Sequence, residues 1–140
     1  MVVIDEKKVM VFGSFDVLHD GHRALFKQAK KHGKLVVVVA RDTSIRHIKN
    51  RRSRQPEIKR HALVRAEKTV DKAVLGHTED FFLVIEREKP NAIMLGYDQA
   101  PRDTRGFVRR LAQRGLRPRI FRGKAYKAHK LKSSKIAKNE

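Results

Sequence analysis

Residues 9–22 read VMVFGSFDVLHDGH. The first four form a short apolar run that ends at Gly13, a pattern that predicts a buried strand. Apolar residues between positions 24 and 29 then recur at helical spacing, and the pattern stops near Gly33. Asp20 is placed to be the N-cap of that helix. The stretch therefore predicts a strand, a short loop and a helix, which is the first unit of an α/β fold.

The rest of the chain repeats this alternation. Further strands are predicted at residues 35–40, 73–75, 92–95 and 119–121. Further helices are predicted at residues 57–69, 80–89 and 105–114, with a last helical turn or two at 133–138. This rhythm predicts a single doubly wound parallel five-stranded sheet of Rossmann-like type. We expect one domain over residues 1–140, with a basic C-terminal segment at 124–140 and a polar, basic and mobile loop at 47–55.

The composition is strongly basic. The chain has 34 Lys and Arg residues against 15 Asp and Glu, which gives a formal net charge of +19. No acidic residue lies between Thr104 and Asn139, and a second acid-free basic run covers residues 46–54. This balance favours a polyanionic partner, which can be a nucleotide, a nucleic acid or an anionic membrane surface.

Two classes of protein are excluded by missing residues and patterns. The sequence has no cysteine, so disulfides, thiol catalysis and thiolate metal sites are ruled out. No apolar run reaches membrane length, and the N-terminus has no signal-peptide pattern. We therefore expect a cytoplasmic protein without a membrane span.

The loop after the first strand has the features of a phosphate site. In a doubly wound sheet, ligands bind beyond the carboxyl ends of the strands, where residues 13–22 lie. The start of a helix offers unpaired N–H groups, and Gly13 and Gly21 permit a close approach of the ligand to the backbone. His19 and His22 flank that start and can donate hydrogen bonds to one phosphate group. The alternatives are two surface histidines or a metal pair, but no third and fourth ligand at zinc spacing is evident.

The segment at 13–22 resembles the H-x-G-H signature of the cytidylyltransferase-like nucleotidyltransferases, whose usual form is G-T-F-D-x-x-H-x-G-H. The whole chain resembles the archaeal FAD synthase branch of that family in length and in motif order. The matching runs are VARD at 39–42, VDKAVLG at 70–76 and LGYDQ at 95–99. Ser14 replaces the common threonine. The family's C-terminal R-T-x-G-I-S-T-T element is only partly present at 132–136, and its leading arginine aligns near Lys127.

The resemblance implies an in-line attack by an acceptor phosphate on the α-phosphorus of a nucleoside triphosphate. His19, His22 and Lys49 are implied as catalytic residues, with Arg51 and Arg52 as near equivalents of the lysine. The implied nucleotide-binding residues are Gly13, Ser14, Phe15, His19, Asp20, Gly21, His22, Asp98, Tyr126, Ser133 and Ser134. The implied cofactor is Mg²⁺, bound mainly through triphosphate oxygens and water, with no metal ligand from the protein.

Some of these residues also have ordinary structural interpretations. Asp98 could instead cap the following helix. Tyr126 could stack on a base or be an ordinary core or surface tyrosine. Asp16 follows a strand, where an aspartate often only holds the loop together. The basic loop around Lys49 could be a solvated surface.

Three functions remain open at this point. The first, following the resemblance, is transfer of AMP from ATP to FMN, which gives FAD and pyrophosphate. The second keeps the chemistry but uses CTP with glycerol 3-phosphate or a similar alcohol phosphate. The third is a basic nucleic-acid-binding module, which the net charge alone supports, because the few aromatic residues do not interleave with the basic ones. A homodimer is expected by analogy with relatives.

Overall fold

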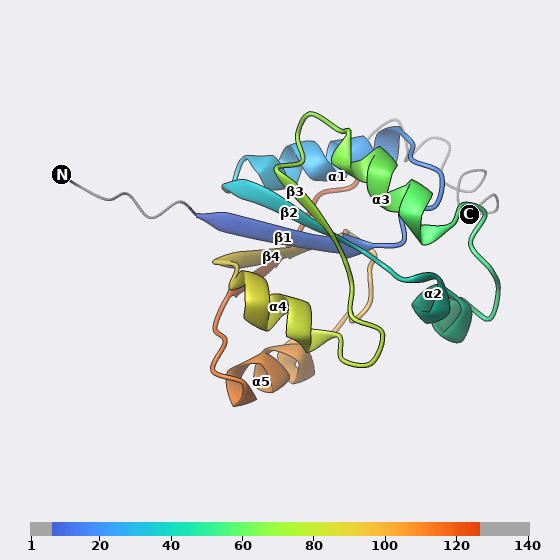
Figure 1. Ribbon diagram of the computed structural model, residues 1–140. Coiled ribbons are helices and arrows are strands. Elements are labelled where there is room, and N and C mark those ends of the chain that lie inside the picture. Colours follow the sequence, from blue (N-terminus) through green and yellow to red (C-terminus); the bar gives the residue numbers. More distant parts are fainter. Residues whose placement is uncertain (1–6, 127–140) are drawn as a thin grey trace.

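The computed structural model describes residues 7–126 and contains one five-stranded, wholly parallel sheet (Figure 1). The strands are β1 (Lys8–Gly13), β2 (Lys34–Val39), β3 (Lys72–Leu75), β4 (Ala92–Leu95) and β5 (Arg119–Arg122). The helices are α1 (Asp20–Lys30), α2 (Asp42–Lys49), α3 (Glu57–Arg65), α4 (Phe82–Glu88) and α5 (Arg105–Gln113). The strand order is β3-β2-β1-β4-β5, so the predicted doubly wound fold is confirmed.

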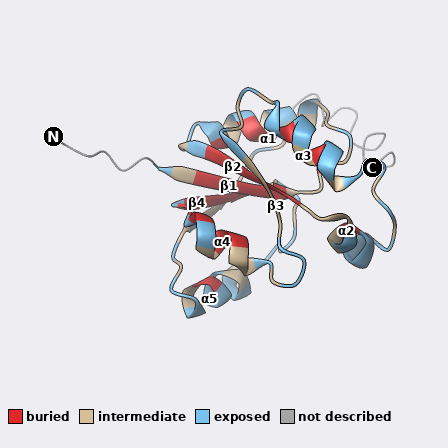
Figure 2. Cartoon of the chain, viewed as in Figure 1, coloured by how far each residue is buried: buried red, intermediate tan, exposed pale blue. Residues whose placement is uncertain are grey.

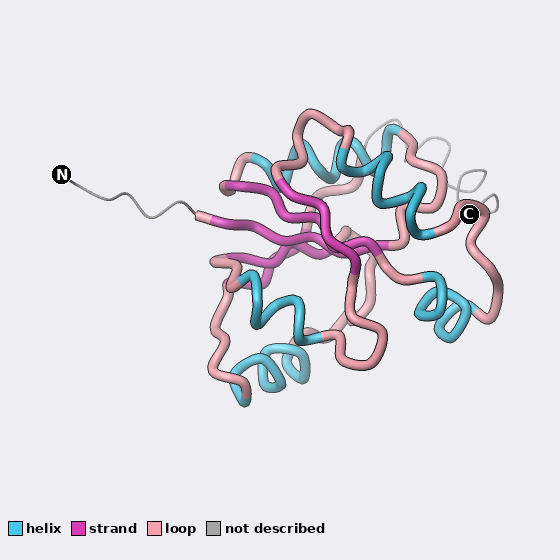
Figure 3. The backbone as a smooth tube through the Cα atoms, viewed as in Figure 1, coloured by secondary structure: helices cyan, strands magenta, loops and turns pink. Residues whose placement is uncertain are grey.

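Helices cover both faces of the sheet. α1 and α3 lie on one face, and α4 and α5 lie on the other (Figures 1 and 3). A hydrophobic core lies on each face of the sheet, and alternate residues of β1 belong to the two cores. Val9 and Val11 pack on the α1 side, and Met10 and Phe12 pack on the α4 side. Residues 35–39 of β2 are all buried. A strand covered on both faces must be apolar at every position, which is why the sequence reads as unbroken hydrophobic runs.

The sheet has its switch point beside β1. β1 pairs with β2 on one side and with β4 on the other, so the chain winds away from it in both directions. Ligands of such sheets bind in the crevice beyond the carboxyl ends of the strands at this point. The loops that follow β1, β2 and β4 all begin at that edge, which Figure 1 shows at the ends of the strand arrows.

The sequence analysis missed α2 and extended some other elements too far. Residues 47–49 were predicted to be loop but form the last turn of α2. Only Ile45 is buried in this eight-residue helix, so one buried anchor leaves no periodic apolar pattern to detect. Figure 2 shows how exposed the helix is. α3 ends at Arg65 rather than at 69, because turns continue the chain as far as Val70.

The remaining differences are at element ends. α4 begins at Phe82 rather than at 80, because the Asp80 carboxylate accepts the Phe82 N–H just before the helix. The helical turn predicted at 133–138 lies outside the described residues, as does most of the basic segment 124–140. The helices in the described part of the chain are short, and none is long and apolar enough to cross a membrane.

Candidate active site

The start of α1 is capped by two histidines. His19, not Asp20 as predicted, is the N-cap residue, and its Nδ1 accepts the Gly21 N–H at 3.1 Å. His22 Nδ1 accepts the His19 N–H at 3.3 Å, which completes a reciprocal capping box. Asp20 is instead the first helical residue and pairs with Arg23 at 3.3 Å. A carboxylate in the first turn suits the helix dipole, but the caps come from the imidazoles.

The capping bonds decide which nitrogen of each ring carries the proton. A neutral imidazole that accepts a hydrogen bond at Nδ1 has its N–H at Nε2. The rings of His19 and His22 stack with centroids 3.8 Å apart and planes 22° apart, and Phe15 meets His22 edge-on at 5.3 Å. Both rings are therefore oriented before any ligand arrives, and each has an Nε2 N–H suited to a phosphate oxygen.

The loop between β1 and α1 is shaped by Phe15. Its ring is 3% exposed and packs on Phe26 with centroids 5.1 Å apart. A Cβ at Gly13 would lie 2.7 Å from this ring, so glycine is required there for packing as well as for any close approach of a ligand. Phe15 and Val17 both have positive φ, at 50° and 65°. Since the Phe15 side chain lies in the core, only its backbone faces the loop where a nucleotide contact was predicted.

A second segment holds this loop in place. The Asp16 carboxylate accepts the backbone N–H groups of Arg54 at 2.6 Å and Gln55 at 2.9 Å. The Gln55 side chain accepts the Val17 N–H at 3.2 Å. Asp16 therefore holds its loop in place, as the sequence predicted for an aspartate after a strand. It joins the loop after β1 to the segment before α3.

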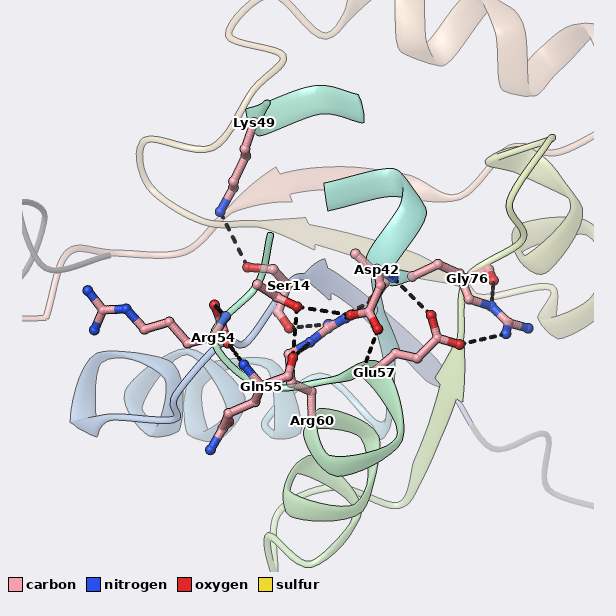
Figure 4. A network of polar contacts seen from close by, with 12 residues as sticks. Ser14, Asp42, Lys49, Arg54, Gln55, Glu57, Arg60 and Gly76 are labelled. Atoms are coloured by element: carbon pink, nitrogen blue, oxygen red, sulfur yellow. Dashed lines mark hydrogen bonds and ion pairs between the residues drawn. The ribbon is translucent and has the colours of Figure 1, made fainter. Parts of the chain in front are cut away.

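Arg60 is the centre of that connection, and its side chain is fully buried. Its guanidinium donates to the carbonyl oxygens of Ser14 at 2.8 Å, Ala40 at 2.7 Å and Gln55 at 2.9 Å. It also donates to the Asp42 carboxylate at 2.7 Å. Figure 4 shows Arg60 pointing from α3 into this group of acceptors. One cation thus joins the loops that follow β1 and β2.

The starts of α2 and α3 are joined through two carboxylates. Asp42 Oδ2 accepts the Glu57 N–H at 3.1 Å, and Glu57 Oε1 accepts the Asp42 N–H at 2.9 Å. Partial burial opposes ionisation of Asp42, but hydrogen bonds from Arg60, the Glu57 backbone and Ser53 together lower its pKa. Asp42 is therefore ionised at neutral pH and balances the buried guanidinium.

Lys49 lies beside the loop after β1. It is the last residue of α2, and its Nζ is 3.4 Å from the Ser14 hydroxyl oxygen (Figure 4). Arg52 is exposed and Arg51 is half-buried in the segment that follows. Lys49 therefore lies in contact with a residue that is predicted to bind the nucleotide.

The loop after β4 is held by Gln99 and Arg122. The Gln99 side chain accepts the Gly96 N–H at 2.9 Å and donates to the Phe12 carbonyl at 3.0 Å, so it joins the ends of β4 and β1. The Arg122 guanidinium donates to four backbone carbonyls of this loop, those of Gly96, Gln99, Pro101 and Arg102. The loop that carries Asp98 is thereby fixed at the switch point.

The other predicted residues are placed as follows. Asp98 is exposed, and since α5 begins only at Arg105 with Thr104 as its N-cap, Asp98 does not cap that helix. Tyr126 is half-buried at the end of the described chain. Ser133 and Ser134 lie outside the described residues. Within residues 7–126 no group of three or more His, Asp or Glu side chains could hold a metal ion.

Sequence reasoning missed three residues that organise the site, namely Arg60, Gln99 and Arg122. A signal existed for Arg60, because it lies four positions before the buried Val64 and so on the core-facing side of α3. No comparable signal marks Arg122, whose partners are all backbone carbonyls. Gln99 lies in the LGYDQ run, but its hydrogen bond to the Phe12 carbonyl spans 87 positions of the chain, which no local pattern indicates.

Comparison with known proteins agrees with this geometry. A model of the cytidylyltransferase-like family matches residues 10–139. The FAD synthase of Ferroglobus placidus is 41% identical over 91% of this chain and 83% of its own length, and that of Aciduliprofundum boonei is 39% identical over 85% and 79%. The crystal structure of a lipopolysaccharide core biosynthesis protein from Thermoplasma volcanium superposes with a TM-score of 0.83 at 38% identity, over 87% of this chain and 99% of that one. The chain belongs to the cytidylyltransferase-like family of nucleotidyltransferases.

Proposed function

We propose that the chain is an FAD synthase, which transfers AMP from ATP to FMN and releases pyrophosphate. The reaction class is carried by one observation, the two oriented imidazoles at the start of α1. The substrates are supported by the relatives, since proteins named FAD synthase match 36–45% of residues in the aligned regions. Nothing in these comparisons favours the glycerol 3-phosphate alternative.

The proposed reaction is a direct displacement at phosphorus. An oxygen of the FMN phosphate attacks the α-phosphorus of ATP and forms a new P–O bond. The bond from the α-phosphorus to the oxygen that bridges to the β-phosphate breaks, and pyrophosphate leaves. A phosphate monoester has a second pKa of about 6, so FMN is already largely dianionic at neutral pH and needs no general base. The protein has to align the two phosphates and stabilise the developing charge.

His19 and His22 are proposed to supply that stabilisation. Their Nε2 N–H groups donate to the α- and β-phosphate oxygens, at the positive end of the α1 dipole. Gly13 and Gly21 allow the phosphates to approach the backbone, and Asp20 lies beside them in the first turn. The caps matter here because an imidazole whose proton is already on Nε2 does not have to change tautomer when the triphosphate binds.

Residues from the neighbouring loops are proposed to hold the rest of the nucleotide. Lys49 and the Ser14 hydroxyl bind the outer phosphates, since they already lie together. Asp98 and Tyr126 contact the nucleoside, and Ser133 and Ser134 bind phosphate. The roles of Ser133 and Ser134 are taken from the family resemblance.

We propose Mg²⁺ as the divalent cation, held mainly by triphosphate oxygens and water. The carboxylates near the histidines suit such a loose arrangement, because both Asp16 oxygens accept backbone N–H groups and Asp20 pairs with Arg23. The cation would neutralise charge on the leaving pyrophosphate. A homodimer and a cytoplasmic location also remain parts of the proposal, and light scattering on the purified chain tests the first.

The test compares substrates directly. Purified chain is incubated with ATP or CTP and with FMN or glycerol 3-phosphate, with Mg²⁺ or with EDTA, while pyrophosphate and FAD are measured. We expect both products from ATP, FMN and Mg²⁺ and from no other combination. Pyrophosphate from CTP and glycerol 3-phosphate, without FAD formation, would overturn the proposal. A steep loss of nucleic-acid affinity with salt, in a chain that releases no pyrophosphate, would instead support the nucleic-acid-binding module.

A further inference from the structure

A cluster of four phenylalanines lies on the opposite face of the sheet from the histidines. Phe12, the last buried residue of β1, contacts Phe81 with ring centroids 4.8 Å apart. Phe81 also meets Phe82 at 5.5 Å and Phe107 at 6.2 Å. Phe12 is 7% exposed, whereas Phe81 is 48% exposed. One side of the Phe81 ring is therefore packed on the core, and a large part of the rest faces solvent.

The segment that presents Phe81 is held by several polar contacts. His77 Nδ1 accepts the N–H groups of Glu79 and Asp80, both at 3.2 Å. Asp80 accepts the Phe82 N–H at 3.0 Å and pairs with Arg114 of the segment after α5 at 2.8 Å. The Arg114 hydrogen bond lowers the pKa of Asp80, so this pair is ionised at neutral pH. The exposed ring is thus positioned by contacts on both sides of it in the chain.

The position of the cluster places it at the edge where ligands bind. Phe12 immediately precedes Gly13, which opens the loop to the histidines, and its carbonyl accepts the Gln99 side chain that joins β1 to β4. Phe81 therefore lies across the end of β1 from the start of α1, beside the switch point. A single exposed apolar residue is common on protein surfaces. An aromatic ring that is half exposed and packs at a 34° tilt on a buried second ring, at the ligand-binding edge, offers an aromatic surface for stacking.

We propose that Phe81 is the platform on which the isoalloxazine ring of FMN stacks, an inference that rests on the proposed function. Isoalloxazine is a broad, planar and largely uncharged ring system, so an aromatic surface suits it better than the charged Lys and Arg side chains of this basic chain. The ribityl phosphate arm then crosses the end of β1 to reach the α-phosphorus held at the start of α1. The two faces of the sheet would thereby divide the acceptor, with the ring on the α4 side and its phosphate on the α1 side.

The test substitutes Phe81 and separates stacking from packing. Phe81→Leu keeps apolar volume over Phe12 but removes the flat ring, whereas Phe81→Tyr and Phe81→Trp keep it. We expect Phe81→Leu to raise the KM for FMN by about tenfold with little change in the KM for ATP, in line with the loss of one stacked ring. The Tyr and Trp variants should stay close to the wild type. Val108→Ala, at a 45% exposed apolar position on α5, is the matched control.

The outcomes distinguish the inference from the function it rests on. The dissociation constants of FMN and riboflavin, measured by fluorescence polarisation, should rise by the same factor in Phe81→Leu, because riboflavin has the ring without the phosphate. A folded Phe81→Leu variant with wild-type KM for FMN and wild-type dissociation constants for both flavins would overturn the platform, while FAD synthesis by the wild type would leave the proposed function standing. If the wild type makes no FAD at all, the proposed function itself fails.

Discussion

The start of α1 and the segment from Ala40 to Arg60 serve the same edge of the sheet but are built in different ways. At the start of α1 the stabilising contacts join His19, Gly21 and His22, which are two or three positions apart. In the second segment the contacts of Arg60 reach back 46 positions to Ser14 and 20 positions to Ala40. Contacts between near neighbours in the sequence cap the first region, whereas long-range contacts of one buried cation join the second.

This difference implies a division of labour. Loss of one local cap at the start of α1 should cost little stability, so substitutions there should act mainly on turnover. Arg60 and its partners Ser14, Ala40, Asp42 and Gln55, here called the Arg60 cluster, hold the loops beside the proposed active site. Loss of these contacts should lower stability first, and activity as a consequence. Substitutions in the two regions should therefore separate turnover from folding.

The largest effect is expected from Arg60→Met. Methionine fits the apolar part of the space but leaves the carbonyls of Ser14, Ala40 and Gln55 and the Asp42 carboxylate without their donor. Leaving a buried acceptor without its donor costs about 1–3 kcal/mol, so the loss of three carbonyl partners should cost about 3 kcal/mol or more. We expect the free energy of unfolding in urea to fall by about that amount, a large fraction of the total for a domain of this size.

Arg65→Met is the matched control for that substitution. Arg65 ends the same helix but is exposed, so its replacement should change the free energy of unfolding by no more than about 0.5 kcal/mol. An equal fall in the free energy of unfolding in the two variants would show that the buried contacts of Arg60 do not stabilise the second region.

Next in size are His19→Ala and His22→Ala. Each should lower turnover by about 10²–10³-fold, because each removes one donor to the reacting phosphates. The lost cap should cost only about 1 kcal/mol of stability. The rate of FAD formation checks the predicted loss of turnover, and thermal unfolding of the same samples checks the predicted loss of stability. His32→Ala, at an exposed position near the other end of α1, is the control; wild-type turnover in both site variants would contradict the assigned roles.

The same contrast explains what could be predicted from sequence. The strands and the doubly wound parallel sheet follow from apolar runs that alternate with helical patterns, which are local signals. The phosphate site at 13–22 stays a prediction, made from glycines, two histidines and a family signature. The N-cap was assigned to Asp20 because aspartate is the commoner cap, and only the geometry shows that the imidazoles take this place. α2 and the partners of Arg60, Gln99 and Arg122 depend on loops brought together by the fold, which no local pattern encodes.

A smaller effect should tell which basic residue of the second region binds phosphate. Lys49→Ala should lower kcat/KM for ATP by roughly tenfold or somewhat more, because it removes one hydrogen bond to a charged group. Arg51→Ala and Arg52→Ala should have weaker effects, since the proposed phosphate contact is assigned to Lys49, whose Nζ lies 3.4 Å from the Ser14 hydroxyl oxygen. Lys27→Ala, at an exposed position on α1, is the control. A stronger effect of either arginine would reassign the phosphate contact.

The smallest effect is expected from the Asp42 carboxylate, which pairs with Arg60. The pKa of Asp42 is lowered below its ordinary value of 3.8 in the folded chain, so its ionic contacts stabilise the fold above that pH and are lost as the pH falls through the lowered pKa. Its side chain is 43% exposed, so solvent screening should limit the contribution to below about 1 kcal/mol. Asp42→Asn keeps the shape but not the charge, and it should flatten the fall in urea stability between about pH 5 and pH 3. Parallel curves for the variant and the wild type would mean that Arg60 is held by its three carbonyl partners alone, and the second region would then depend on hydrogen bonds to the backbone rather than on an ion pair.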